Sequence, residues 1–266
     1  MNRLRLKTAL VSALLIRKKR MAITHFRVNI ITARQSVVWR AAQYHRVRML
    51  LKMQGKESTS ECRGLPDHAE VMLPVSAPRW IVDIVESVAP WRASQDIWNK
   101  ITMEERANGQ LAREIVVALP VELNRDQNIA LMRDFIELYL VSLGVVVDWV
   151  FRDECGNPHV RILHTLRPIG DHGFGPKFIP VREGDGNPVR CDDGNKIVYQ
   201  ALVGGGRNDL LKLRNDWGVT VNRHLEMAGH EARIDVRSYD VRGIEKMPDK
   251  HTGGVGMAID MRKESA

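Results

Sequence analysis

Cysteine is scarce in this chain of 266 residues, which contains only Cys62, Cys155 and Cys191. Three scattered cysteines exclude a disulfide framework and a paired Cys-x-x-Cys zinc site, so a reducing cytoplasmic location is expected. Long apolar runs are also missing. The run at residues 8–16 is shorter than the ~20 residues that cross a bilayer. Neither GxGxxG nor GxxxxGK[ST] occurs, which argues against the common nucleotide-binding loops.

What is present is a globular composition with an uneven charge. The chain is 44% hydrophobic and 27% charged, with a formal net charge of +8. Residues 1–20 contain seven Arg or Lys and no acid, and residues 27–63 contain eight Arg or Lys against two Glu. The basic character therefore lies in one patch, which can hold a polyanion such as nucleic acid. The alternative is an ordinary solvated helix face.

The basic segment at residues 1–20 has three interpretations. It is too short for a membrane span, and it lacks the small-residue cleavage site of a signal peptide. The favoured interpretation is a start codon assigned too early, with translation beginning at Met21. We therefore expect a leader over 1–20, one domain over 21–258 and a tail over 259–266, in a cytoplasmic protein without a membrane span.

Apolar periodicity and turn residues predict alternating strands and helices. Expected strands cover residues 21–33, 115–119, 145–151 and 160–166, with a β-hairpin over 178–199. Expected helices cover residues 36–53, 77–108, 124–144 and 208–228, with a loop at 54–68 and an irregular tail from residue 233. The pair Asn124 and Gln127 has capping-box spacing, which makes the third helix the best defined.

Several short blocks of sequence occur in a characteristic order. They are MAITHF (21–26), SVVWRAA (36–42), WNK (98–100), QLAREIVVALPVEL (110–123), QNIALMRDF (127–135), VVVDWVFRDECGNPH (145–159), TLRP (165–168), DHGFGPK (171–177) and RSYDVRGIEKMPDKH (237–251). Together the blocks resemble the MobA/MobL family of conjugative relaxases, and most of all the N-terminal relaxase domain of TraA-type plasmid transfer proteins. The resemblance covers about residues 21–258.

The resemblance implies a fold and an activity. The implied fold is α/β, an antiparallel sheet of about five strands with helices packed on one face. The implied activity is plasmid-transfer nicking of single-stranded DNA at a transfer origin, through a phosphotyrosine intermediate. A divalent metal (Mg²⁺ or Mn²⁺) on three histidines and a basic DNA groove would assist, and relaxosome accessory proteins are possible partners. TraA-type proteins normally continue into a helicase region, so a chain ending at Ala266 is expected to be a relaxase domain alone or a truncated copy.

The expected metal ligands are altered. The family pattern Asn-Pro-His-x-His reads Asn-Pro-His159-Val-Arg161 here, and Arg152 stands where the third histidine is expected. Arginine keeps its proton and offers no lone pair to a metal, which leaves His159 alone. His164 is a possible substitute. Its odd spacing from His159 puts it on the opposite face of a regular strand, however, and only a bulge would bring it round.

The expected nucleophile is also displaced. The family motif resembles Ser-Val-Val-x-x-Ala-Ala-Tyr, whereas this chain has Gln43 after the two alanines and Tyr44 one residue later. One residue is about 100° of rotation round a helix. Either a local shift recovers Tyr44 as the nucleophile, or the nucleophile is lost. A third possibility is that Tyr44 is a packing residue.

Other residues are candidates for the same site. Glu114 is expected to be an acidic neighbour of the phosphate or, equally, an ordinary strand residue, and His251 matches a family histidine. The expected DNA contacts are Arg40, Arg46, Arg48, Arg167 and Lys177. Trp39 and Tyr44 can offer faces for base stacking among these arginines.

Three functions follow from these features. The first is an active relaxase, and the second is a catalytically impaired remnant that only binds single-stranded DNA. The third, least favoured, is a metal-independent phosphodiesterase in which Arg152 and Arg161 carry the phosphate charge.

Overall fold

The computed structural model describes residues 25–58, 64–154, 156–191, 194–204 and 206–236. The chain divides into a unit over Met1–Ile234 and a second over Asp235–Ala266, and the helices and strands of the described residues lie in the first. The leader at 1–20, the tail at 259–266, Cys62, Cys155 and His251 fall outside the described residues. No described helix has both the length and the apolar character needed to cross a membrane.

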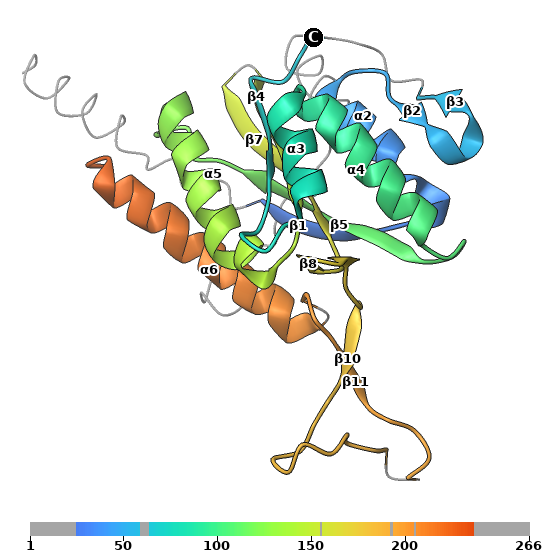
Figure 1. Cartoon of the computed structure of the whole chain (residues 1–266). Helices are drawn as coiled ribbons and strands as arrows, with labels where there is room; N and C mark the ends of the chain where they lie inside the picture. Colours follow the sequence, from blue (N-terminus) through green and yellow to red (C-terminus); the bar gives the residue numbers. More distant parts are fainter. Residues whose placement is uncertain (1–24, 59–63, 155, 192–193, 205, 237–266) are drawn as a thin grey trace, which may run out of the picture. The chain divides into compact units, whose positions relative to one another are not determined.

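A five-stranded sheet forms the centre of the first unit (Figure 1). Its strand order is β1-β5-β7-β6-β4, and every neighbouring pair is antiparallel. The strands are β1 (Phe26–Thr32), β4 (His68–Met72), β5 (Gln110–Ala118), β6 (Val147–Glu154) and β7 (Asn157–Thr165). The predicted antiparallel sheet of about five strands with packed helices is confirmed.

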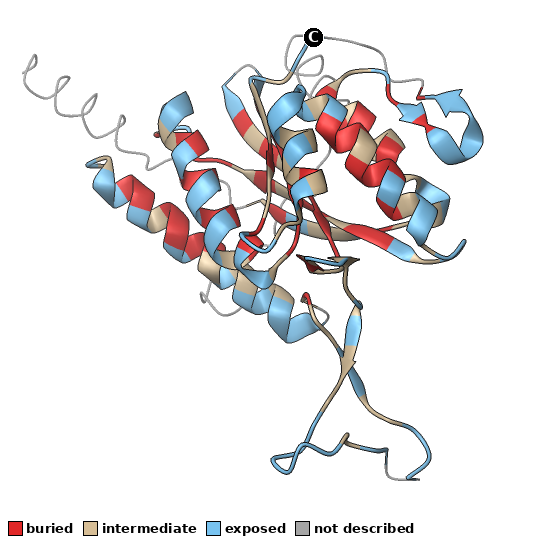
Figure 2. Cartoon of the chain, in the orientation of Figure 1, coloured by how far each residue is buried: buried red, intermediate tan, exposed pale blue. Residues whose placement is uncertain are grey.

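The helices cover both faces of this sheet rather than one. On one face lie α2 (Val37–His45), α3 (Arg79–Ser87) and α4 (Pro90–Glu104). On the other lie α5 (Arg125–Tyr139) and α6 (Arg207–Met227), where the Phe135 ring is 5.1 Å from that of Trp217 and 6.4 Å from that of Phe26. Figure 2 shows buried residues forming stripes along α5, α6 and α4. Two apolar faces need cover because the central strands are buried on both sides.

Short elements complete the unit. They are β2 (Leu50–Leu51) paired with β3 (Lys56–Glu57), β8 (Ile169–Gly170) with β9 (Gly173–Phe174), β10 (Phe178–Pro180) with β11 (Tyr199–Ala201), and 3₁₀ turns at Ala33–Gln35, Lys52–Gln54 and Val141–Leu143. The β10–β11 pairing, continued by isolated bridges from Arg182 to Pro188 and from Arg190 to Ile197, confirms the hairpin predicted over 178–199.

Local signals explain both the confirmed helices and the corrected ones. The capping box of Asn124 and Gln127 opens α5, and Gly144 takes the left-handed conformation after its end. The helix predicted to reach Met53 stops at His45, because Arg46 adopts the left-handed conformation (φ 52°). The helix predicted over 77–108 is broken before Pro90, since a residue preceding proline disfavours helical backbone. Strand β4 was not predicted at all.

Candidate functional site

Helix α2 carries two of the candidate side chains toward the sheet. The Ser36 hydroxyl caps it by accepting from the Trp39 amide at 3.3 Å. Arg40 and Tyr44 are one turn apart and therefore lie on the same side of the helix. Tyr44 is only 3% exposed and belongs to the core between α2 and the sheet, whereas Gln43 is half-buried. The side chain that packs against the sheet is therefore that of Tyr44, whereas Gln43 is turned partly to solvent.

Strands β6 and β7 bring the three expected ligand positions together, two of which are altered. Arg152 lies directly across from His159, and Arg161 is two residues along β7 from His159, on the same face of the sheet. Leu163 continues this face into the core beneath α2 and α4. The face that carries His159 is thus the face that Tyr44 covers.

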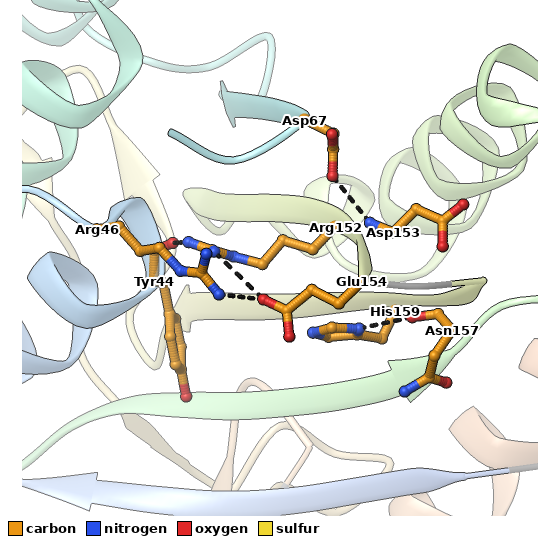
Figure 3. Close-up of polar contacts among 8 residues, drawn as sticks. All are labelled: Tyr44, Arg46, Asp67, Arg152, Asp153, Glu154, Asn157 and His159. Atoms are coloured by element: carbon orange, nitrogen blue, oxygen red, sulfur yellow. Dashed lines mark hydrogen bonds and ion pairs between the residues drawn. The ribbon is translucent and has the colours of Figure 1, made fainter. Parts of the chain in front are cut away.

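Arg152 is held by its neighbours in a largely desolvated position (Figure 3). It donates to the backbone oxygen of Tyr44 and forms an ion pair with Glu154, at 3.7 Å. Burial and the adjacent Arg46 lower the pKa of Arg152 to about 10, which still leaves it charged at neutral pH. Glu154 also accepts from Arg46, so one carboxylate joins two guanidiniums. The Nδ1 atom of His159 lies 2.9 Å from the Asn157 backbone oxygen.

Glu114 lies in the same site. It is buried, accepts from the Asn29 amide at 2.5 Å and pairs with Nε of Arg40 at 3.6 Å. The guanidinium carbon of Arg161 is 5.0 Å from the centre of the Tyr44 ring. Burial lowers the pKa of Arg161, and the carboxylates of Glu114 and Glu154 oppose the shift. The predicted residues Arg40, Tyr44, Glu114 and His159 are therefore brought together.

The side chains around His159 do not form a set of ligands that fits a divalent metal. Arg152 and Arg161 present only cationic donors beside the single imidazole of His159. The nearby carboxylates of Glu114 and Glu154 are engaged by arginines. Within the described parts of the chain, no group of three or more His, Cys, Asp or Glu side chains is placed to hold a metal ion. No catalytic step can be assigned to a metal here.

His164 does not substitute for the missing ligands. It lies on the opposite face of β7, beside Arg113, where it lines a cavity of about 600 Å³ under α5 and α6. The strand is regular from 157 to 165, so the bulge needed to bring His164 round is absent from it. Nδ1 of His164 lies 2.9 Å from the Thr165 oxygen, and burial lowers its pKa to about 4.

The depressed pKa of His164 predicts a pH-dependent stability. In the unfolded chain His164 has a pKa of ~6.5, so it binds a proton as pH falls below this value. In the folded chain it binds that proton only near its lowered pKa of about 4. His164 should therefore cost about 2 kcal/mol of unfolding free energy between pH 7 and 5. Urea unfolding of wild type and His164→Gln at both pH values isolates this effect, because glutamine does not titrate. An equal pH dependence in both proteins would contradict it.

Arg167 and Lys177 lie away from the site that contains His159, Tyr44 and Glu114. Both pair with Glu105, Arg167 at 3.2 Å, near the end of β7 opposite to His159. Arg48, in contrast, follows α2 and is exposed. Whether Arg167, Lys177 and Arg48 contact DNA stays a prediction.

A buried polar network beside the site was not foreseen. The fully buried Asp148 on β6 accepts from Ser94 at 2.6 Å and Trp98 at 2.9 Å, both on α4, and lies 2.9 Å from Nε2 of His45. Burial works to raise the pKa of Asp148, but His45 and these hydrogen bonds outweigh it and lower the pKa. His45 and Trp98 lie on the buried sides of their helices, and the one signal in the sequence that they meet a polar partner is the unusual Asp inside a buried strand. The network fixes α2 and α4 on the sheet.

Comparison with curated proteins gives relatives of one kind. The chain is 40% identical over 248 residues to "Conjugal transfer protein TraA" of Rhizobium radiobacter, covering 92% of this chain and 22% of the relative. It is 39% identical to the protein of the same name from Agrobacterium fabrum, with the same coverage. Identity to "Mobilization protein A" of Escherichia coli is 33%, over 59% of this chain and 22% of the relative. The chain spans about a fifth of the length of these relatives.

A solved structure from work on the "Molecular Basis of Vancomycin Resistance Transfer in Staphylococcus aureus" matches with a TM-score of 0.64. It is 26% identical, and the match covers 82% of this chain and all of that one. The family model described as "MobA/MobL family" matches residues 35–262, which include every strand and helix of the central sheet except β1. This chain belongs to the MobA/MobL family.

Proposed function

We propose that this chain is a relaxase-type domain that binds single-stranded DNA at a transfer origin and whose strand-cleavage chemistry is impaired. The observation that supports the impairment is that Arg152 and Arg161 lie next to His159 on one sheet face, where two further imidazoles would be needed to hold a metal. DNA binding is supported by family membership and by the guanidiniums gathered on that face. The cytoplasm, where plasmid DNA lies, is the location we propose.

Cleavage through Tyr44 is the second candidate function. It is favoured by the placement of the Tyr44 ring against Arg161, on the same sheet face as His159. A neighbouring cation stabilises a tyrosine oxyanion and so assists nucleophilic attack. The burial of Tyr44 argues against it, because the ring has little room for a scissile phosphate without movement.

A covalent-adduct assay separates the two functions. Under the proposed function, wild type incubated with Mn²⁺ and single-stranded oligonucleotides tiled across the DNA flanking its gene should form no adduct stable to SDS. If an adduct forms, Tyr44→Phe should abolish it, since this change removes one oxygen and keeps the ring. The matched control is Tyr199→Phe, at a tyrosine 57% exposed on β11. A robust wild-type adduct lost only in Tyr44→Phe would establish the second function and refute the first.

The salt dependence of binding tests the DNA interface. Each phosphate that Arg or Lys neutralises releases counterions, so affinity for single-stranded DNA should fall steeply as salt rises. Replacing Arg40, Arg46 and Arg48 together with Gln should lower the slope of log K against log salt by about 0.7 for each phosphate that is no longer neutralised. Arg79→Gln is the control, because Arg79 lies on α3 and pairs with Asp83 in solvent. Fluorescence anisotropy with a chain that begins at Met21 measures this, and an unchanged slope would contradict the interface.

A further inference from the structure

Four arginines and two glutamates make a cluster with excess positive charge on the α2 face of the sheet. We call Arg40, Arg46, Arg152, Arg161, Glu114 and Glu154 the arginine cluster. Arg40 pairs with Glu114, while Arg46 and Arg152 share Glu154. Among the described residues, no carboxylate lies within ion-pair distance of Arg161. Asp67 adds a third carboxylate near Arg152, so four cations face three anions, and among the described residues Arg161 is the member without an ion pair.

The surroundings of Arg161 make this lack costly. Its Nε atom is buried and has no hydrogen-bond partner in the described part of the chain. One side of the guanidinium is occupied by the Tyr44 ring, which offers a cation–π contact but accepts no strong hydrogen bond. A guanidinium stays protonated even when desolvated, so it cannot relieve the cost by losing its charge. Arg161 is half-buried, and a cation in this position with an unused Nε donor is best satisfied by an anionic acceptor.

The chemistry of the missing acceptor follows from the geometry of the donors. A guanidinium presents planar, paired N–H donors that match the oxygens of a phosphate, and charge-assisted bonds of this kind are the strong ones. Arg40 and Arg46 are each about 30% exposed on the same face, so an anion from solvent can reach the cluster. Arg161 and Arg152 lie beside His159, at the position where the family resemblance implies a metal ion that binds the phosphate.

We propose that Arg161, supported by the arginine cluster, binds one backbone phosphodiester of single-stranded DNA directly, without a metal ion. This inference rests on the proposed function, since it specifies how the same site holds DNA. The cluster replaces the metal in charge neutralisation only. A guanidinium is not a Lewis acid that polarises a scissile phosphate, so the inference covers binding of the strand and not its cleavage.

The experiment measures (dT)₁₂ affinity by fluorescence anisotropy for wild type and variants, in EDTA and in Mn²⁺. Wild-type affinity should agree within about twofold between the two conditions, because Arg161 itself holds the phosphate. Arg161→Gln should weaken binding about tenfold and lower the salt slope by about 0.7, the value for one phosphate on a single strand. The control is Arg223→Gln, whose arginine pairs with Asp134 on the opposite face of the sheet. Loss of wild-type binding in EDTA, or an unchanged affinity in a folded Arg161→Gln, would overturn the inference.

A second measurement uses the unaltered protein and so does not depend on a variant that folds. Wild type is treated with phenylglyoxal in EDTA, with and without saturating (dT)₁₂, and the modified arginines are located by mass spectrometry. Arg161 should be protected by the oligonucleotide, whereas Arg223 should react equally in both samples. Bound DNA that leaves Arg161 unprotected would contradict this inference and leave the proposed function standing. Absence of any DNA binding would contradict both.

Discussion

Replacing both Arg152 and Arg161 with histidine should raise the affinity for Mn²⁺ by roughly 100-fold, which corresponds to about 2.8 kcal/mol. Cross-strand pairing puts position 152 next to His159, and strand alternation puts position 161 on the same face. The double variant would therefore present three imidazoles from two adjacent strands to one point. It would also remove two cations that repel a metal ion.

Isothermal titration with Mn²⁺ is the direct measurement for the histidine variant. The single change Arg161→His should give an intermediate gain, because it supplies two imidazoles instead of three. Arg79→His is the matched control, since it adds one histidine at an exposed position of α3 with a single carboxylate, Asp83, beside it. Tight Mn²⁺ binding by wild type would mean that carboxylates near His159 leave their arginine partners and bind the metal instead. An unchanged affinity in the double variant would mean that the three positions do not converge.

The parts of the fold that the sequence predicted depend on local chemistry. The capping box of Asn124 and Gln127 opens a helix wherever its neighbours allow one, and α5 begins where it predicts. The parts that failed depend on tertiary contacts. Helix α2 ends early, where Arg46 forms an ion pair with Glu154 at the end of β6. Residues 68–72 form strand β4 because they pair with β6. Neither partner is visible from periodicity.

The candidate site divides along the same line. Strand alternation alone placed His159 and Arg161 on one face and His164 on the other, as the structure has them. Sequence spacing gave no register between strands, so the contact of Arg161 with Tyr44 and the pairing of Glu114 with Arg40 could not be derived. Arg167 and Lys177 were assigned to the site by their nearness in sequence to β7, but that strand is long enough to carry them away to Glu105.

Replacing Asp148 with asparagine should cost about 3–5 kcal/mol of unfolding free energy, because it breaks a buried charged network. The carboxylate accepts from Ser94 and Trp98 and lies 2.9 Å from His45, with an exposed fraction of 4%. Asparagine keeps the shape but loses the negative charge and turns an amide donor toward these donors. The melting temperature should fall by roughly 10 °C. Urea unfolding with a van't Hoff melt measures both quantities.

The matched control for that change is Asp96→Asn, also a single Asp to Asn replacement at an ion pair. Asp96 lies on α4 and pairs with Lys52 at 3.4 Å, but both side chains are substantially exposed, so its loss should cost at most about 1 kcal/mol. Equal destabilisation by Asp148→Asn and Asp96→Asn would contradict the buried network.

The difference should also depend on pH with a defined sign. Since the pKa of Asp148 is lowered in the folded chain, its contribution is complete above the unfolded value of 3.8 and is lost as pH falls through the lower folded value. The unfolding free energies of Asp148→Asn and wild type should therefore converge in strongly acidic solution.

Because His45 follows Tyr44 directly, the same change should loosen the end of α2, so DNA affinity should fall along with stability. An affinity preserved in the destabilised variant would show that α2 reaches its place without Asp148.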